Sequence, residues 1–190
     1  MELLKEKILQ YGKVFPGNIL KVDSFLNHQV DTALLSEMGK EICRLYKEDK
    51  ITKILTIESS GIAIAAFAAN EMKVPMLFAK KSQTKNISAD VYTSKVMSYT
   101  HGKVYDIIVS TEYLKKGDRV LIVDDFLANG KALVGLIDLC KQAGAEVVGC
   151  AIAIEKAFQK GGDALRAEGI RIESLAKIGS MTDHGLTFVD

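Results

Sequence analysis

The chain alternates short apolar runs with segments in which apolar residues recur at helical spacing. Runs at 51–57, 74–79, 120–123 and 147–154 predict buried strands. Apolar stripes predict helices at 2–11, 31–45, 62–72 and from 132 onward, with a short helix at 163–168. Because strands and helices alternate, the pattern predicts an α/β fold with a mostly parallel sheet and helices on both faces.

The remaining segments carry weaker patterns. Residues 14–30 show no clear period, and 82–90 are polar without periodicity, which predicts a mobile loop. Residues 91–100 and 103–110 predict a hairpin, and 171–178 and 186–189 predict edge strands.

Polar residues follow four of the predicted strands at the point where each strand ends. Glu58, Lys80, Asp124 and Lys156 all occupy such positions. Because the carboxyl ends of parallel strands meet at one edge of the sheet, we expect these side chains to converge where open α/β folds bind ligands.

Composition narrows the functional class. A chain of 190 residues with 48% hydrophobic residues predicts one globular domain over 1–190. The net charge of +1 argues against general binding to nucleic acid or acidic membranes. Residues 1–7 do not resemble a secretory signal, and the longest apolar run, 61–69, is too short to cross a bilayer. These features predict a cytoplasmic protein.

The cysteines predict buried free thiols. Cys43, Cys140 and Cys150 are odd in number, widely spaced and set among apolar neighbours. Their spacing does not support a metal site built by the protein alone.

The segment 120–132 combines a buried strand, two carboxylates, a small-residue loop and the start of a helix. Free N–H groups at a helix N-terminus can hold a phosphate, and Asp124 and Asp125 can bind sugar hydroxyls or a divalent cation. A buried strand that ends in a solvated turn with two surface aspartates would give the same pattern.

This segment resembles the phosphoribosyl diphosphate (PRPP) signature of the type I phosphoribosyltransferases. The family usually has hydroxyl residues at the positions of Asn129 and Ala132. The resemblance implies a central mostly parallel twisted sheet flanked by helices, a hood from about 12–30 and 155–190, and a flexible hairpin flap at about 82–105. It also implies that the 5′-phosphate is held by Ala128, Asn129, Gly130, Lys131 and Ala132, and that Asp124 and Asp125 act in catalysis.

Other segments resemble further parts of the same family. Ser59 and Ser60, in a strand-to-helix turn whose Ser59-Ser60 peptide matches a position often strained or cis in relatives, resemble the pyrophosphate loop. Lys80 and Lys81 resemble its basic pair, and Tyr99 resembles a residue of the catalytic flap. An ordinary turn, a solvated charge pair and a packed tyrosine are the respective alternatives.

The base is expected to contact Leu20, Asn27 and Lys156. Together these segments resemble the bacterial branch of the family that uses xanthine, and the resemblance covers nearly the whole chain. It implies a homodimeric purine-salvage enzyme that converts xanthine and PRPP, with Mg²⁺ carried by PRPP, to xanthosine 5′-monophosphate and diphosphate, with guanine as a weaker substrate. For Lys156, a surface lysine packed on Phe158 is the alternative.

Two other functions remain open. An adenine-specific member is one, although the amino group of adenine does not suit a donor such as Lys156. A non-catalytic PRPP-sensing regulator is the other, although fewer than about 60 residues precede the first sheet strand and leave little room for a DNA-binding domain.

Overall fold

The computed structural model describes residues 1–81, 90–97, 104–182 and 185–190. A six-stranded sheet in the order β10-β9-β8-β7-β3-β4 forms its centre. The sheet strands are β3 (Lys53–Ile57), β4 (Met76–Ala79), β7 (Arg119–Leu127), β8 (Glu146–Lys156), β9 (Ile172–Thr182) and β10 (Gly185–Val189). Only β10 runs antiparallel to its neighbour, so the prediction of a mostly parallel sheet is confirmed.

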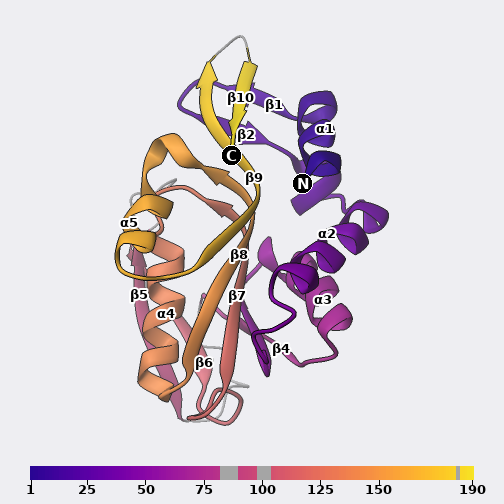
Figure 1. The fold of residues 1–190 in the computed structure, drawn as a ribbon. Helices are drawn as coiled ribbons and strands as arrows, with labels where there is room; N and C mark the ends of the chain where they lie inside the picture. Colours follow the sequence, from indigo (N-terminus) through magenta and orange to yellow (C-terminus); the bar gives the residue numbers. More distant parts are fainter. Residues whose placement is uncertain (82–89, 98–103, 183–184) are drawn as a thin grey trace.

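Helices cover both faces of this sheet (Figure 1). They are α1 (Glu2–Tyr11), α2 (Thr32–Leu45), α3 (Gly61–Met72), α4 (Lys131–Ala143) and α5 (Gly161–Ala167). Leu121 and Val123 of β7 point toward the layer of α2 and α3, whereas Val120 and Ile122 point toward α4. Because successive strand residues face opposite sides, a continuous apolar run is what a strand between two helical layers requires.

Strand β7 extends beyond its predicted end. The sequence places the end at the two carboxylates, but β7 continues to Leu127, with Asp124 opposite Ile152 and Phe126 opposite Ile154 of β8. Pairing with the eleven-residue strand β8 supplies backbone hydrogen bonds that local hydrophobicity does not reveal. The two aspartates therefore lie on a rigid strand.

For one of the two predicted edge strands, the predicted position at the edge of the sheet is wrong. The segment predicted at 171–178 forms β9, which lies between β8 and β10, while β4 and β10 form the edges. Polar residues such as Ser174 within β9 are typical of a strand at the edge of a sheet. The Ser174 hydroxyl instead bonds to the nearly buried carboxylate of Glu155.

The segment 14–30 is more regular than its sequence suggests. It contains the antiparallel pair β1 (Lys13–Phe15) and β2 (Ile19–Lys21), followed by a π-helical turn at Asp23–Asn27. Gly17 and Asn18 turn the hairpin with φ of 83° and 61°. Strands of three residues are too short to show alternation, which explains why the pattern predicted no structure.

The two ends of the chain meet above one end of the sheet (Figure 1). The Met1 amino group donates to the main-chain oxygen of Leu175 in β9, and the Lys5 ammonium lies 5.7 Å from the centre of the Phe188 ring in β10. Lys156 also bonds to the loop between β1 and β2. The bond from Lys156 joins the two segments predicted to form a hood, 12–30 and 155–190.

The predicted hairpin is confirmed as the antiparallel pair β5 (Val91–Met97) and β6 (Val104–Ser110). Residues 82–89 and the turn at 98–103 lie outside the described residues, so the predicted mobile loop and Tyr99 are not placed. Within the described ranges, no helix has the length and apolar character needed to span a membrane.

Candidate active site

A cavity of about 170 Å³ opens at the carboxyl ends of the parallel strands. Its lining residues are Ile57, Glu58, Ser59, Ser60, Gly61, Lys81, Tyr105, Asp124, Asp125 and Ala132. They come from the loops after β3 and β4, from β6 and β7, and from the first turns of α3 and α4. The prediction that polar residues following the strands converge at one edge is confirmed for Glu58 and Asp124, whereas Lys80 and Lys156 do not line this cavity.

The two aspartates occupy different surroundings because successive strand residues point in opposite directions. Asp124 is 5% exposed, and its Oδ1 accepts the Asp125 N–H at 2.9 Å. Asp125 reaches toward the hood, where its Oδ2 accepts a hydrogen bond from Asn27 Nδ2 at 2.9 Å. Burial, and then the neighbouring Asp125 charge, raise the pKa of Asp124 well above its usual value.

The buried Asp124 charge should cost stability. A carboxyl whose pKa is higher in the folded than in the unfolded state loses stability as the pH rises through that interval. We expect Asp124→Asn to raise Tm at pH 8 by about 2–4 °C, as for a gain of about 1 kcal/mol in a domain of this length, because Asn keeps the Oδ1 acceptor without the charge. The gain should shrink as the pH falls toward 5, as measured by thermal unfolding.

Asp106→Asn is the matched control for this measurement, because the Asp106 side chain is 53% exposed and lies on β6. It should show no such pH-dependent gain. A lower Tm for Asp124→Asn than for the unchanged protein at pH 8 would contradict the interpretation of Asp124 as a destabilising buried charge.

The loop between β3 and α3 brings Ser59 and Ser60 to the cavity. A cis peptide bond joins Glu58 to Ser59, so the expectation of a special peptide between Ser59 and Ser60 is wrong by one position. A Cβ on Gly61 would lie 3.0 Å from Asp124 Oδ1 and 2.2 Å from the Thr56 hydroxyl oxygen. Only glycine permits the loop to approach Asp124 this closely.

The loop from Ala128 to Ala132 joins β7 to α4. Gly130 has a φ of 78°, which favours glycine, and Asn129 Oδ1 accepts the N–H of Lys131 at 3.2 Å. Asn129 thus holds the turn with its oxygen and keeps its amide nitrogen as a donor. The N–H groups of the first turn of α4 point toward this end of the sheet, as a phosphate site requires.

The two lysines after β4 differ in position. Lys81 lines the cavity, and its ammonium lies 5.5 Å from the centre of the Tyr105 ring. Lys80 exchanges two main-chain hydrogen bonds with Ile108 of β6, and it is not among the described residues that line the cavity. The structure therefore brings Lys81, but not Lys80, to the aspartates.

The residues predicted to contact the base belong to the two segments predicted to form the hood. Lys156 Nζ donates to the main-chain oxygen of Asn18 at 2.8 Å and lies 5.3 Å from the centre of the Phe126 ring, whereas the alternative interpretation placed its stem on Phe158. Burial lowers the pKa of Lys156, and the nearby Asp125 charge opposes this shift.

Leu20 differs from the other two predicted base contacts. Its side chain is 6% exposed and packs in the core shared by the hood and α2, so its predicted contact with a base stays a prediction. Asn27, by contrast, bonds to Asp125, and the Asp125 charge acts on the pKa of Lys156.

Comparison with known proteins identifies this arrangement. The family model described as a phosphoribosyl transferase domain matches residues 22–168. The chain belongs to the phosphoribosyltransferase family. It is 57% identical over 189 residues to the protein named xanthine phosphoribosyltransferase of Lachnoclostridium phytofermentans, with 100% of this chain and 97% of that protein covered. The protein of that name from Alkaliphilus metalliredigens is 55% identical, with 100% and 94% covered.

Solved structures show that the fold is that of the type I phosphoribosyltransferases. The adenine phosphoribosyltransferase of Giardia lamblia, complexed with 9-deazaadenine, has a TM-score of 0.76 and 26% identity, with 92% of this chain and 97% of that chain covered. The enzyme of Trypanosoma brucei has a TM-score of 0.77 and 19% identity, with 96% and 82% covered. The prediction of fold and family from sequence is confirmed.

Sequence reasoning missed one side chain of this phosphoribosyltransferase cavity. Tyr105 shares a face of β6 with the buried Ile107 and Val109, and its ring reaches the cavity. Burial, and then the Asp124 charge, raise the pKa of its hydroxyl group. The alternation of Tyr105, Ile107 and Val109 was the available signal, because it places the tyrosine on the inward face of its strand.

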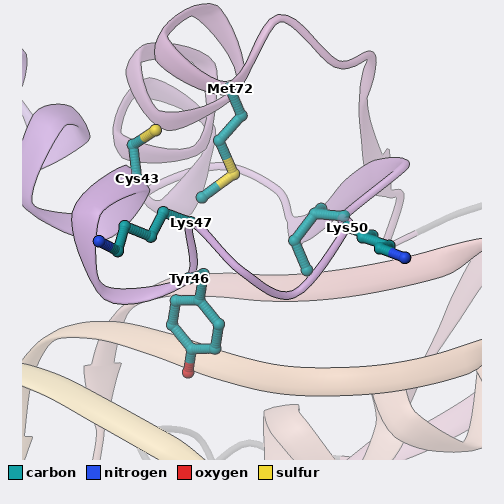
Figure 2. Close-up of a pocket in the computed structure, with 6 residues that line it drawn as sticks. Cys43, Tyr46, Lys47, Lys50 and Met72 are labelled. Carbon is teal, nitrogen blue, oxygen red and sulfur yellow. The ribbon is translucent and has the colours of Figure 1, made fainter.

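A second cavity, of about 220 Å³, lies near the opposite end of the sheet (Figure 2). Cys43, Tyr46, Lys47, Lys50, Ile51 and Met72 line it, and residues 50 and 51 directly precede β3. Cys140 and Cys150 are buried free thiols as predicted, whereas Cys43 is partly exposed. This cavity shares no lining residue with the cavity that contains the two aspartates.

Proposed function

We propose that this chain transfers the phosphoribosyl group of PRPP to xanthine, forming xanthosine 5′-monophosphate and diphosphate, with guanine as a weaker substrate. One observation carries the proposal: several relatives named xanthine phosphoribosyltransferase are 51–57% identical over essentially the full chain. The adenine phosphoribosyltransferases of known structure named above are only 19% and 26% identical.

The arrangement of the cavity supports a binding mode for PRPP. The loop 128–132 would hold the 5′-phosphate with its N–H groups and the Asn129 amide. Asp124 and Asp125 would accept hydrogen bonds from the ribose hydroxyls. Ser59, Ser60 and Lys81 would hold the diphosphate, with Lys80 able to reach it only if its side chain turns toward the cavity.

The reaction then needs positioning more than covalent catalysis. A base nitrogen forms a bond to the anomeric carbon while the bond from that carbon to the diphosphate oxygen breaks, through a cationic, oxocarbenium-like sugar. The negative charges of Asp124 and Asp125 would stabilise this cation, and Lys81 would stabilise the departing diphosphate. Direct transfer of this kind requires no protein nucleophile.

Base selection would come from Lys156 and Asn27. A lysine ammonium can only donate hydrogen bonds, so it suits a purine oxo group and opposes the amino group of adenine. Lys156 donates to Asn18 and Asn27 donates to Asp125 in the structure. Binding of xanthine would exchange these hydrogen bonds for bonds to the base, which keeps both polar groups satisfied in either state.

We further propose that Mg²⁺ enters with PRPP, and that the enzyme acts as a homodimer in the cytoplasm. Within the described residues, no group of three or more His, Cys, Asp or Glu side chains is arranged to hold a metal ion. Glu58, Asp124 and Asp125 offer carboxylate oxygens beside the expected diphosphate. The resemblance to the family supports the dimer, and the free cysteines fit a reducing compartment.

The test is product formation from PRPP and Mg²⁺ with xanthine, guanine, hypoxanthine and adenine measured in parallel. We expect kcat/KM for xanthine to exceed that for every other base by at least about tenfold, or about 1.4 kcal/mol of transition-state binding. A preference for adenine would overturn the assignment. Tight binding of PRPP without turnover of any base would instead favour the PRPP-sensing regulator.

A further inference from the structure

An ion pair at the end of β8 joins a nearly buried carboxylate to an arginine whose side chain is 30% exposed. Glu155, the residue before Lys156 at the end of β8, is 1% exposed. Its two carboxylate oxygens accept hydrogen bonds from the two terminal nitrogens of Arg166, each at 2.7 Å, and the Ser174 hydroxyl donates a further one. Two parallel bonds between a guanidinium and a carboxylate fix both the distance and the angle between their two elements.

The arginine belongs to α5, and α5 also contacts the loop 128–132. The N–H of Gly161, the first residue of α5, donates to the main-chain oxygen of Ala128 at 3.1 Å. A Cβ on Gly161 would lie 2.3 Å from that oxygen and 2.6 Å from the Gly130 nitrogen. The start of α5 therefore lies in main-chain contact with the loop.

Two further contacts complete this connection. A Cβ on Gly130 would lie 3.2 Å from Leu165 Cδ1, so the side chain before Arg166 also rests against the loop. A Cβ on Gly162 would lie 2.0 Å from Glu155 Oε1, so the carboxylate is held against the first turn of α5. The short helix thus has the ion pair on one side and the loop 128–132 on the other.

We propose that Glu155 and Arg166 are positioning residues that hold the loop 128–132 in the shape that binds the 5′-phosphate, acting through α5. This inference rests on the proposed function, because it assigns the 5′-phosphate of PRPP to that loop. Neither residue lines the cavity as described, and both side chains are engaged with each other, so we assign neither a contact with the substrate. The pair acts by fixing α5, and α5 acts by limiting where Ala128 and Gly130 can move.

The burial of the Glu155 carboxylate argues for a positioning role over simple stabilisation. Removing a carboxylate from water is costly, and apolar or neutral pairs of similar volume often stabilise a fold equally well. What such a neutral pair does not reproduce is the fixed two-point geometry between β8 and α5. A neutral replacement should therefore preserve folding and weaken phosphate binding.

The experiment is the double variant Glu155→Gln/Arg166→Met, which removes both charges together and leaves no unpaired buried ion. We expect the dissociation constant for PRPP with Mg²⁺, measured by titration calorimetry without base, to rise at least about tenfold. The KM for xanthine should change by less than about threefold. Arg166→Lys, which keeps the charge without the two-point contact, should fall between the double variant and the unchanged protein.

A second ion pair provides the matched control. Lys53 and Asp118 lie 2.7 Å apart, their side chains are 14% and 19% exposed, and they lie at the amino ends of β3 and β7. The double variant Lys53→Met/Asp118→Asn should change Tm but leave PRPP binding within about twofold. This control separates loss of stability from loss of positioning.

Gly161→Ala tests the same connection without altering the ion pair, because the added methyl group meets main-chain atoms of the loop. It should also weaken PRPP binding about tenfold. Unchanged PRPP binding in a folded Glu155→Gln/Arg166→Met variant would overturn the proposal, whatever Gly161→Ala does. Failure of the proposed function would show itself separately, as an absence of xanthine turnover by the unchanged protein.

Discussion

Replacement of both Asp124 and Asp125 by Asn is expected to lower kcat by at least about 10³-fold while the protein stays folded. Charge that develops on the sugar in the transition state is stabilised by groups already fixed on β7, and removing one such group typically costs a factor of about 10²–10³. Asparagine retains an oxygen at each position, so the hydrogen bonds from Asn27 and from the Asp125 N–H can persist. The main change is therefore the loss of negative charge.

The measurement is single-turnover formation of xanthosine 5′-monophosphate, together with calorimetric binding of PRPP. Asp106→Asn/Asp138→Asn is the matched control, because it removes two carboxylates on β6 and α4 that do not line the cavity. It should keep kcat within about twofold. A double variant of Asp124 and Asp125 with an unchanged rate would remove the two aspartates from the chemistry.

The strands, the helices and the edge that carries the site could be predicted because their signals are local. Val120–Val123 and 147–154 are continuous apolar runs, and the apolar stripe in α2 follows helical spacing along the helix. Short-range patterns of this strength survive in almost any tertiary context. The prediction that Glu58 and Asp124 converge followed from the parallel direction of the strands alone.

Features that depend on distant partners were not visible in the sequence. The length of β7 depends on pairing with β8, and the inner position of β9 depends on its pairing with β8 and β10. Gly161 looks like an ordinary loop residue until α5 is placed against the loop after β7. In each case the deciding contact joins residues far apart in the chain, which residue spacing does not encode.

Lys156 carries the second large prediction, which concerns base specificity. Lys156→Met keeps most of the side-chain volume and removes the ammonium. A hydrogen bond from a charged group contributes about 1.5–3 kcal/mol, so the KM for xanthine should rise about 10–100-fold. The KM for PRPP should change by less than about threefold, because the Lys156 ammonium donates to Asn18 in the hood and lies over the Phe126 ring.

Lys160→Met is the matched control, since Lys160 is four residues away and its side chain is 75% exposed. It should leave both KM values unchanged. Equal rises in the two KM values for Lys156→Met would contradict a role in base recognition and indicate a general disturbance of the site.

The lowered pKa of Lys156 predicts how base binding changes as the pH rises. Burial favours the neutral amine, so the donor that holds the base is lost as the pH rises, and it is lost at a lower pH than for an exposed lysine. Arginine does not lose its proton in this range. The ratio of kcat/KM for xanthine between Lys156→Arg and the unchanged protein should therefore increase from pH 7 to pH 10. Titration of the base itself affects both proteins equally and therefore cancels in this ratio. A constant ratio would show that the protonation of Lys156 does not control base binding.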